Sequence, residues 1–135
     1  MTVTFVSGCF DLIHPGHIAL LEFAASFGAK TFVAVDSDTR VRQTKGLARP
    51  IQEEQARVQV IEAIKFVSAA KLFSTDEELR ALIAELQPDR LVLGSDWRGK
   101  RIIGSEIVRE VVFLNRVDDH STSKLVDRVL GRPQA

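Results

Sequence analysis

The chain has 135 residues, 45% of them hydrophobic, and its 18 basic residues balance 18 acidic ones. This length and apolar content predict a single domain, residues 1–135, with one hydrophobic core. The balanced charge argues against nucleic acid or an anionic membrane surface as a partner, because there is neither a global positive field nor a polybasic segment.

The apolar stretches of the sequence also show no sign of a targeting signal. No apolar stretch approaches the ~18 residues of a membrane span, and the apolar run 3–6 is too short for the core of a signal peptide. The single cysteine, Cys9, cannot form an internal disulfide, and nothing resembles a zinc site made of paired cysteines. We therefore expect a cytoplasmic protein.

The first half of the chain alternates short apolar runs with helical patterns. Residues 3–6 form an apolar, β-branched run that ends at Ser7-Gly8, which predicts a buried strand. A helix is expected from Pro15 to the stop at Gly28. A second strand follows at 31–35, then a polar turn, and an apolar stripe predicts a helix from 53 to about 66.

The second half continues the alternation. Residues 71–73 predict a third strand, and Ser74 and Thr75 fit the capping box of a helix that ends before Pro88. Strands are expected at 90–94 and 111–114, with a short helix around 105–109 between them. Ser121 is placed to cap a last helix that runs to about residue 130.

Alternating strands and helices predict an α/β fold, a three-layer doubly wound (Rossmann-like) parallel sheet of five strands with right-handed crossovers. Ligands of such sheets bind outside the carboxyl ends of the strands, near the point where the strand order reverses. Four polar segments follow strands, and we expect them to meet in one cleft: 8–17, 36–50, 94–104 and 115–124.

The densest cluster joins the first strand to the first helix. His14 and His17 lie three residues apart at the expected helix start, beside backbone N–H groups that can hold an anion, and Gly16 between them lets a phosphate approach. Two histidines near a helix start can also be simple capping residues. A zinc site is the weaker alternative, because the third ligand nearby would have to be Cys9 or Asp11.

The cluster Gly8-x-Phe10-Asp11-x-x-His14-x-Gly16-His17 resembles the cytidylyltransferase-like nucleotidyltransferases, which share an H-x-G-H motif with class I aminoacyl-tRNA synthetases. The resemblance implies a nucleotidyltransferase fold of the HUP type. It also implies that this loop and helix bind a nucleoside triphosphate, and that the two histidines stabilise the pentavalent transition state at the α-phosphorus.

Further matches extend over most of the chain. The run Lys45-Gly46-Leu47-Ala48-Arg49-Pro50 resembles the K-G-x-x-R-P segment of heptose 1-phosphate adenylyltransferases, as does the run that begins at Gly104. In contrast, Gly94-x-Asp96-Trp97 and Arg116 resemble glycerol-3-phosphate cytidylyltransferases. Glu54-Gln55-x-Arg57 is similar to the family's E-Q-R helix start, with Ala56 inserted. Ser121-Thr122-Ser123 is similar to an S-T-T segment that contacts phosphate.

Several of these residues have two open interpretations. Lys45, on a loop expected from 39 to 50, can cover a triphosphate as a mobile charge or remain a solvated lysine. Asp11 can orient a histidine, bind the acceptor or bond its own backbone. Trp97 is a platform for a base or sugar or a packing residue. Arg116 is a phosphate clamp or the partner of a neighbouring Asp.

Asp36, at the end of the second strand, is placed to bind a ribose hydroxyl, as acidic residues do in other nucleotide folds. The resulting expectation has three groups of residues. The catalytic residues are His14, His17 and Lys45, the nucleotide-binding residues are Gly8, Cys9, Phe10, Gly16, Asp36, Gly94, Arg116, Ser121, Thr122 and Ser123, and the acceptor-binding residues are Asp11, Arg57, Asp96 and Trp97.

These features favour an enzyme that transfers a nucleotide monophosphate to a phosphorylated sugar or polyol by direct in-line attack, with Mg²⁺ bound to the triphosphate. ATP with heptose 1-phosphate is the leading pair, and CTP with glycerol 3-phosphate is the alternative. A non-catalytic nucleotide-binding module is the alternative of another class. Neither a P-loop nor a G-x-G-x-x-G motif occurs. The resemblance also implies a homodimer.

Overall fold

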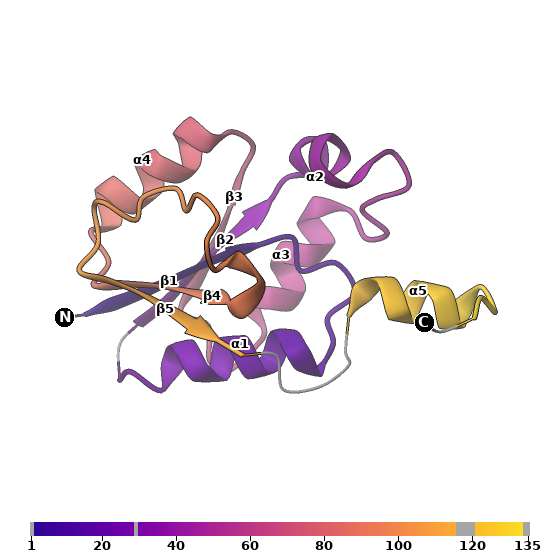
Figure 1. The fold of residues 1–135 in the computed structure, drawn as a ribbon, viewed down its shortest axis with the longest axis horizontal. Coiled ribbons are helices and arrows are strands. Elements are labelled where there is room, and N and C mark those ends of the chain that lie inside the picture. The colour runs from indigo at the N-terminus through magenta and orange to yellow at the C-terminus, as the bar shows by residue number, and fades with distance from the viewer. Residues whose placement is uncertain (1, 29, 116–120, 134–135) are drawn as a thin grey trace.

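The computed structural model describes residues 2–28, 30–115 and 121–133. Its centre is a parallel five-stranded sheet in the order β3-β2-β1-β4-β5, which confirms the predicted α/β fold (Figure 1). The order reverses at β1, because the chain first builds outward through β2 and β3 and then continues on the other side of β1 with β4 and β5. The strands are β1 (Val3–Gly8), β2 (Lys30–Asp36), β3 (Ala69–Phe73), β4 (Arg90–Gly94) and β5 (Glu110–Leu114).

Helices cover both faces of the sheet, giving three layers (Figure 1). Side chains alternate along β1: Val6 packs with α1 (Pro15–Ala25) and α3 (Glu54–Glu62), while Phe5 faces α4 (Asp76–Leu86). Successive side chains of a strand point to opposite faces, so each buried strand serves two hydrophobic clusters. None of the helices in the described part of the chain combines the length and hydrophobicity needed to cross a membrane.

The sheet opens where β1 and β4 end. The register pairs β1 with β4 at Thr4 and Phe5, whereas Ser7 and Gly8, at the carboxyl end of β1, pair with β2. The end of β1 therefore has a backbone neighbour on one side, and a crevice forms between it and β4. This is the place at which ligands of doubly wound sheets bind.

The expected loop 39–50 is wrong in its first half, where the structure has the helix α2 (Asp38–Lys45). The Ser37 hydroxyl caps it by accepting from Arg40 N–H at 3.2 Å, and Glu54 accepts from Asp38 N–H at 2.9 Å. Val41 is its one buried residue. A helix with a single apolar anchor has no apolar stripe, so the pattern that identifies the other helices is missing.

The helix expected around 105–109 is also wrong, since that segment consists of turns. Gly104 has φ +84°, and a Cβ there would lie 2.6 Å from Ile83 Cδ1, so a left-handed turn packs against α4 in its place. A short 3₁₀ helix, η1 (Ser95–Trp97), was not expected. The predicted caps of α4 and of α5 (Thr122–Val129) are confirmed: Thr75 Oγ1 accepts from Glu78 N–H and Ser121 Oγ from Lys124 N–H.

Candidate active site

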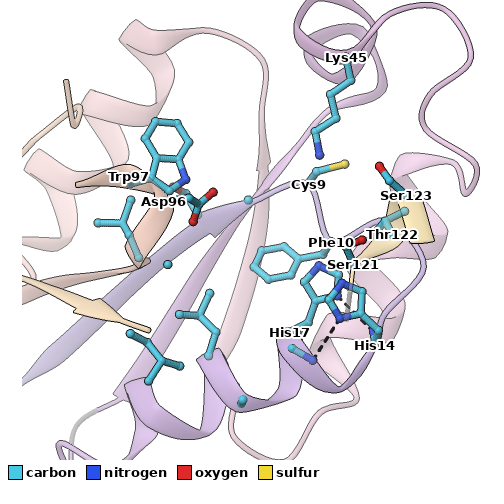
Figure 2. Close-up of a pocket in the computed structure, with 18 of the residues that line it drawn as sticks. Cys9, Phe10, His14, His17, Lys45, Asp96, Trp97, Ser121, Thr122 and Ser123 are labelled. Atoms are coloured by element: carbon cyan, nitrogen blue, oxygen red, sulfur yellow. Dashed lines mark hydrogen bonds between the residues drawn. The ribbon is translucent and has the colours of Figure 1, made fainter. Parts of the chain in front are cut away.

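The four polar segments meet, as expected, at the carboxyl ends of β1, β4 and β5. They form a cavity of about 570 Å³, termed here the first cavity. Figure 2 shows the histidine pair on one side, Lys45 above, Asp96 and Trp97 on the opposite side, and the start of α5 nearby. The expected residues on its wall are Gly8, Cys9, Phe10, His14, Gly16, His17, Lys45, Gly94, Asp96, Trp97, Ser121, Thr122 and Ser123.

The two imidazoles are oriented by the backbone. His14 is the N-cap of α1, and its Nδ1 accepts from Gly16 N–H at 3.1 Å. Nδ1 of His17 accepts from His14 N–H at 3.2 Å, and the two ring centroids lie 3.8 Å apart. A neutral imidazole whose Nδ1 accepts a hydrogen bond carries its proton on Nε2. Both rings are therefore neutral donors through Nε2.

This capping changes one expectation about the start of α1. The sequence suggests free N–H groups there for an anion, yet Pro15 has none, Gly16 N–H is bonded to His14 Nδ1, and His17 N–H donates to His14 O at 3.0 Å. The first-turn donors are thus already used. Capping is compatible with the catalytic role expected of the histidines, because each ring bonds the backbone through Nδ1 and carries its proton on Nε2.

Burial holds His17 in the neutral form. Burial, followed by the neighbouring His14 and Lys45, lowers the pKa of His17 from 6.5 to about 3. A neutral Nε2–H can donate to a developing negative charge but cannot accept a proton there. The geometry therefore suits stabilisation of an oxyanion rather than general base catalysis.

Lys45 is the last residue of α2 and not a loop residue. Its amine points down toward Cys9 in Figure 2. Its charge acts on Cys9, His17 and Asp36, which places the ammonium group among all three. A cation held on a helix in this position faces any anion that enters the first cavity.

Asp11 and Arg57 were expected to bind the acceptor, but the structure buries both side chains and bonds them within the protein. Asp11 is 2% exposed and accepts from the N–H groups of Ile51 at 2.7 Å and Gln52 at 2.9 Å. Arg57 is 0% exposed, and neither residue is part of the cavity wall. These ionised groups are buried because backbone groups satisfy them, as buried charges require.

The Arg57 guanidinium joins three elements. It donates to the carbonyl oxygens of Cys9 at 2.8 Å, Asp36 at 2.6 Å and Gln52 at 2.9 Å, and to Asp38 Oδ1 at 2.8 Å. The ends of β1 and β2 and the start of α2 are thereby fixed relative to one another. The sequence signal was the E-Q-x-R pattern, but a pattern cannot show that the side chain points inward.

The three hydroxyl groups at the start of α5 make different hydrogen bonds. Ser121 caps the helix, Thr122 donates to Asp11 O at 2.5 Å, and Ser123 Oγ accepts from Arg49 Nη2 at 3.3 Å. All three hydroxyl residues line the first cavity, and so does Arg49, which sequence reasoning did not select. Arg116 lies outside the described residues.

The wall opposite the histidines comes from β4 and η1. A Cβ at Gly94 would lie 2.7 Å from Asp96 Oδ1, so glycine allows the turn to bring that carboxylate close. Trp97 is 44% exposed. An indole with one open face can support a flat or apolar ligand face, as expected for this residue.

A second cavity, of about 330 Å³, lies on the α4 side of the sheet. It shares wall residues with the first cavity, among them Gly8, Lys45 and Trp97. Asp36 lines this second cavity and not the first, so the expected contact with a ribose in the first cavity is not supported. Burial raises the pKa of both Asp36 and the Cys9 thiol.

Within the described ranges, no group of three or more His, Cys, Asp and Glu side chains is placed to hold a metal ion.

A family model described as cytidylyltransferase-like matches residues 5–128. The bifunctional protein HldE of Campylobacter fetus subsp. fetus is 39% identical over 130 residues, which are 96% of this chain and 28% of that protein. HldE of Azorhizobium caulinodans is 42% identical over 130 residues, 93% of this chain and 27% of that protein. The chain thus spans little more than a quarter of the curated relatives it matches.

Among solved structures, a lipopolysaccharide core biosynthesis protein from Thermoplasma volcanium GSS1 is similar with a TM-score of 0.73 and 26% identity, over 87% of this chain and 99% of that chain. A protein of unknown function from Archaeoglobus fulgidus has a TM-score of 0.64 at 18% identity and shares the fold.

Proposed function

The chain belongs to the cytidylyltransferase-like family and is a nucleotidyltransferase, and from that premise we propose that it joins ATP to a sugar 1-phosphate, with heptose 1-phosphate as the acceptor. The observation that carries this proposal is the pair of imidazoles on the wall of the first cavity, beside Lys45, whose Nδ1 atoms accept backbone N–H groups, so that each ring carries its proton on Nε2 as a donor. Two such donors suit a phosphorus centre that gains negative charge.

The reaction is one in-line displacement. An oxygen of the acceptor phosphate forms a bond to the α-phosphorus while the bond from that phosphorus to the bridging oxygen of the β-phosphate breaks, and pyrophosphate leaves with the electron pair. His14, His17 and Lys45 neutralise charge that develops on the α-phosphate and the leaving group. No protein nucleophile takes part, and burial, which raises the pKa of Cys9, keeps that thiol protonated.

The choice of ATP and heptose 1-phosphate rests on the similarity of this chain to other proteins. The run from Lys45 to Pro50 resembles heptose 1-phosphate adenylyltransferases, the similar curated proteins are named HldE, and the similar archaeal protein is a lipopolysaccharide core biosynthesis protein. CTP with glycerol 3-phosphate is the second candidate, favoured by Gly94-x-Asp96-Trp97. Other activities of the longer relatives are not part of the proposal, because this chain matches about a quarter of them.

The proposed function also involves a metal ion, an oligomeric state and a cellular location. Mg²⁺ enters with the triphosphate and supplies positive charge to its oxygens, in keeping with a cavity that offers it few ligands. The acting form is a homodimer, as the resemblance implies. The location is the cytoplasm, where the free and buried Cys9 would stay reduced.

Pyrophosphate release tests the proposal. Each of four nucleoside triphosphates is combined with heptose 1-phosphate, glycerol 3-phosphate and other sugar phosphates, with and without EDTA. We expect release with ATP and heptose 1-phosphate, and its loss on chelation. Release with CTP and glycerol 3-phosphate alone would select the second candidate, while nucleotide binding without release from any pair would indicate a non-catalytic module.

A further inference from the structure

We propose that the Asp36 carboxylate recognises hydroxyl groups of the acceptor in the second cavity, so that this cavity selects a polyhydroxylated phosphate over a cationic one such as phosphoethanolamine. This inference rests on the proposed function, because it assumes a phosphorylated acceptor. From the sequence, Asp36 was expected to bind the ribose of the nucleotide, whereas here it is assigned to the acceptor.

Asp36 holds a fixed position at the end of β2. The residue ends β2, and its carbonyl oxygen accepts from Arg57 Nη1 at 2.6 Å, so its backbone is held in place. Its carboxylate makes no hydrogen bond or ion pair with another residue in the described ranges, although Arg57 and Arg40 are near. A half-buried carboxylate without protein donors is a costly feature that a ligand donor would offset.

Two of the three cations that act on Asp36, Arg40 and Arg57, make their hydrogen bonds and ion pairs with other groups, and the third is Lys45. Arg40 Nη2 lies 2.9 Å from Asp76 Oδ1, and its guanidinium stacks 4.8 Å from the centre of the Phe73 ring. Arg57 directs its hydrogen bonds to Asp38 and to carbonyl oxygens. Burial raises the pKa of Asp36, and the charges of Arg40, Lys45 and Arg57 offset this effect only in part.

The two cavities are adjacent and share part of their walls. They meet at Gly8 and Lys45, the first holding about 570 Å³ and the second about 330 Å³. The larger substrate, the triphosphate, fits the first cavity beside the histidines. An acceptor whose phosphate meets Lys45 then extends its carbon chain into the second cavity, toward Asp36.

The charged side chains that line the second cavity are mostly basic. Among the described residues that line it, Asp36 is the one acid, whereas the bases are Arg40, Lys45 and Arg101. A positive ammonium group would meet three like charges there, which disfavours an amino alcohol. A hydroxyl group is neutral and donates to a carboxylate, so a sugar or polyol satisfies Asp36 without this repulsion.

The test is Asp36→Asn, which keeps the shape and removes the charge, compared with Asp76→Asn, which makes the same change on the other side of Arg40 and outside the second cavity. We expect Asp36→Asn to lower kcat/KM for heptose 1-phosphate by roughly 10–100-fold, the range of one hydrogen bond to a charged group, with KM for ATP unchanged. Asp76→Asn should stay within about threefold of the unsubstituted protein. The unfolding midpoint of each variant checks the fold.

Two readouts separate this inference from the proposed function. Heptose 1-phosphate binding, measured by calorimetry with a non-hydrolysable ATP analogue, should weaken in Asp36→Asn even if no pair of substrates releases pyrophosphate. A deoxy analogue of the acceptor should lose affinity for the unsubstituted protein more than for Asp36→Asn. A raised KM for ATP alone would return Asp36 to the ribose. Unchanged acceptor binding, absent acceptor binding or efficient use of phosphoethanolamine would overturn the inference.

Discussion

In the proposed mechanism each histidine of the pair has two tasks, a hydrogen bond to the backbone through Nδ1 and donation to the substrate through Nε2, and substitution can separate them. Asn places an acceptor near the position of Nδ1, whereas Gln places a donor near that of Nε2. His17→Asn should keep the hydrogen bond from His14 N–H and lower kcat by about 100–1,000-fold, as expected for loss of a transition-state donor. Turnover assays with each variant check this expectation.

His17→Gln is the matched control. It should retain more turnover than His17→Asn but lose about 1 kcal/mol of unfolding free energy, since a Gln side chain that donates at the Nε2 position no longer accepts from His14 N–H, while the cap from His14 Nδ1 to Gly16 N–H remains. If both variants turned over at near-normal rates, the histidine mechanism would be wrong.

The depressed pKa of His17 also predicts how stability depends on pH. The native pKa is about 3, against 6.5 for the unperturbed group, so between these values the unfolded chain binds a proton that the native protein does not. The contribution of His17 is therefore full above pH 6.5 and is lost as the pH falls toward 3. Urea unfolding at pH 7 and pH 5 should show a smaller loss in His17→Asn than in the unsubstituted protein; equal losses would contradict the neutral, buried state.

The Arg57 side chain holds several segments of the chain together, so its removal should lower the free energy of unfolding. Arg57→Met leaves Asp38 and three carbonyl oxygens without their donor, and we expect a loss of about 3–5 kcal/mol in unfolding free energy. The control is Arg42→Met on the exposed side of α2, which should change stability by less than about 0.5 kcal/mol. A stable Arg57→Met with a raised acceptor KM would restore the original acceptor role.

At the scale of elements, α2 and the segment after it should behave differently on nucleotide binding. α2 is already helical and capped, so its amides should exchange slowly without nucleotide. After it, Gly46 turns with φ +94° and Leu47 is 90% exposed, while Arg49 reaches Ser123 at the start of α5. ATP with Mg²⁺ should increase protection at 46–50 and 121–124. Equal protection of these segments with and without nucleotide would rule out closure over the phosphates.

At the scale of the whole molecule, the expected homodimer is checked by its mass. Light scattering at micromolar concentration should give twice the 15.0 kDa of the chain. The Asp76→Asn protein serves as a second sample with an altered surface charge, and the same mass is expected for it. A mass near that of one chain would exclude the dimer at this concentration.

The amino-acid sequence by itself determined the order and kind of most elements. Short apolar runs predict all five strands, the third of them from residues 71–73 alone, and local chemistry predicts the caps at Thr75 and Ser121, because both signals act over a few neighbouring residues. The motif around His14 and His17 likewise predicts the helix start and the cavity beside it, since the two rings are separated by less than one helical turn.

Only the tertiary structure decided which charged residues face a ligand and which face the core. Asp11 and Arg57 look like site residues in the sequence, but backbone groups that lie 40 and 48 positions away, Ile51 N–H and Cys9 O, satisfy them internally. Asp36 lines the second cavity and not the first. The helix α2 has Val41 as its buried residue, and Glu54 accepts a hydrogen bond from Asp38 N–H at its start. Burial depends on contacts between segments far apart in the chain, and no local pattern of residue types contains that information.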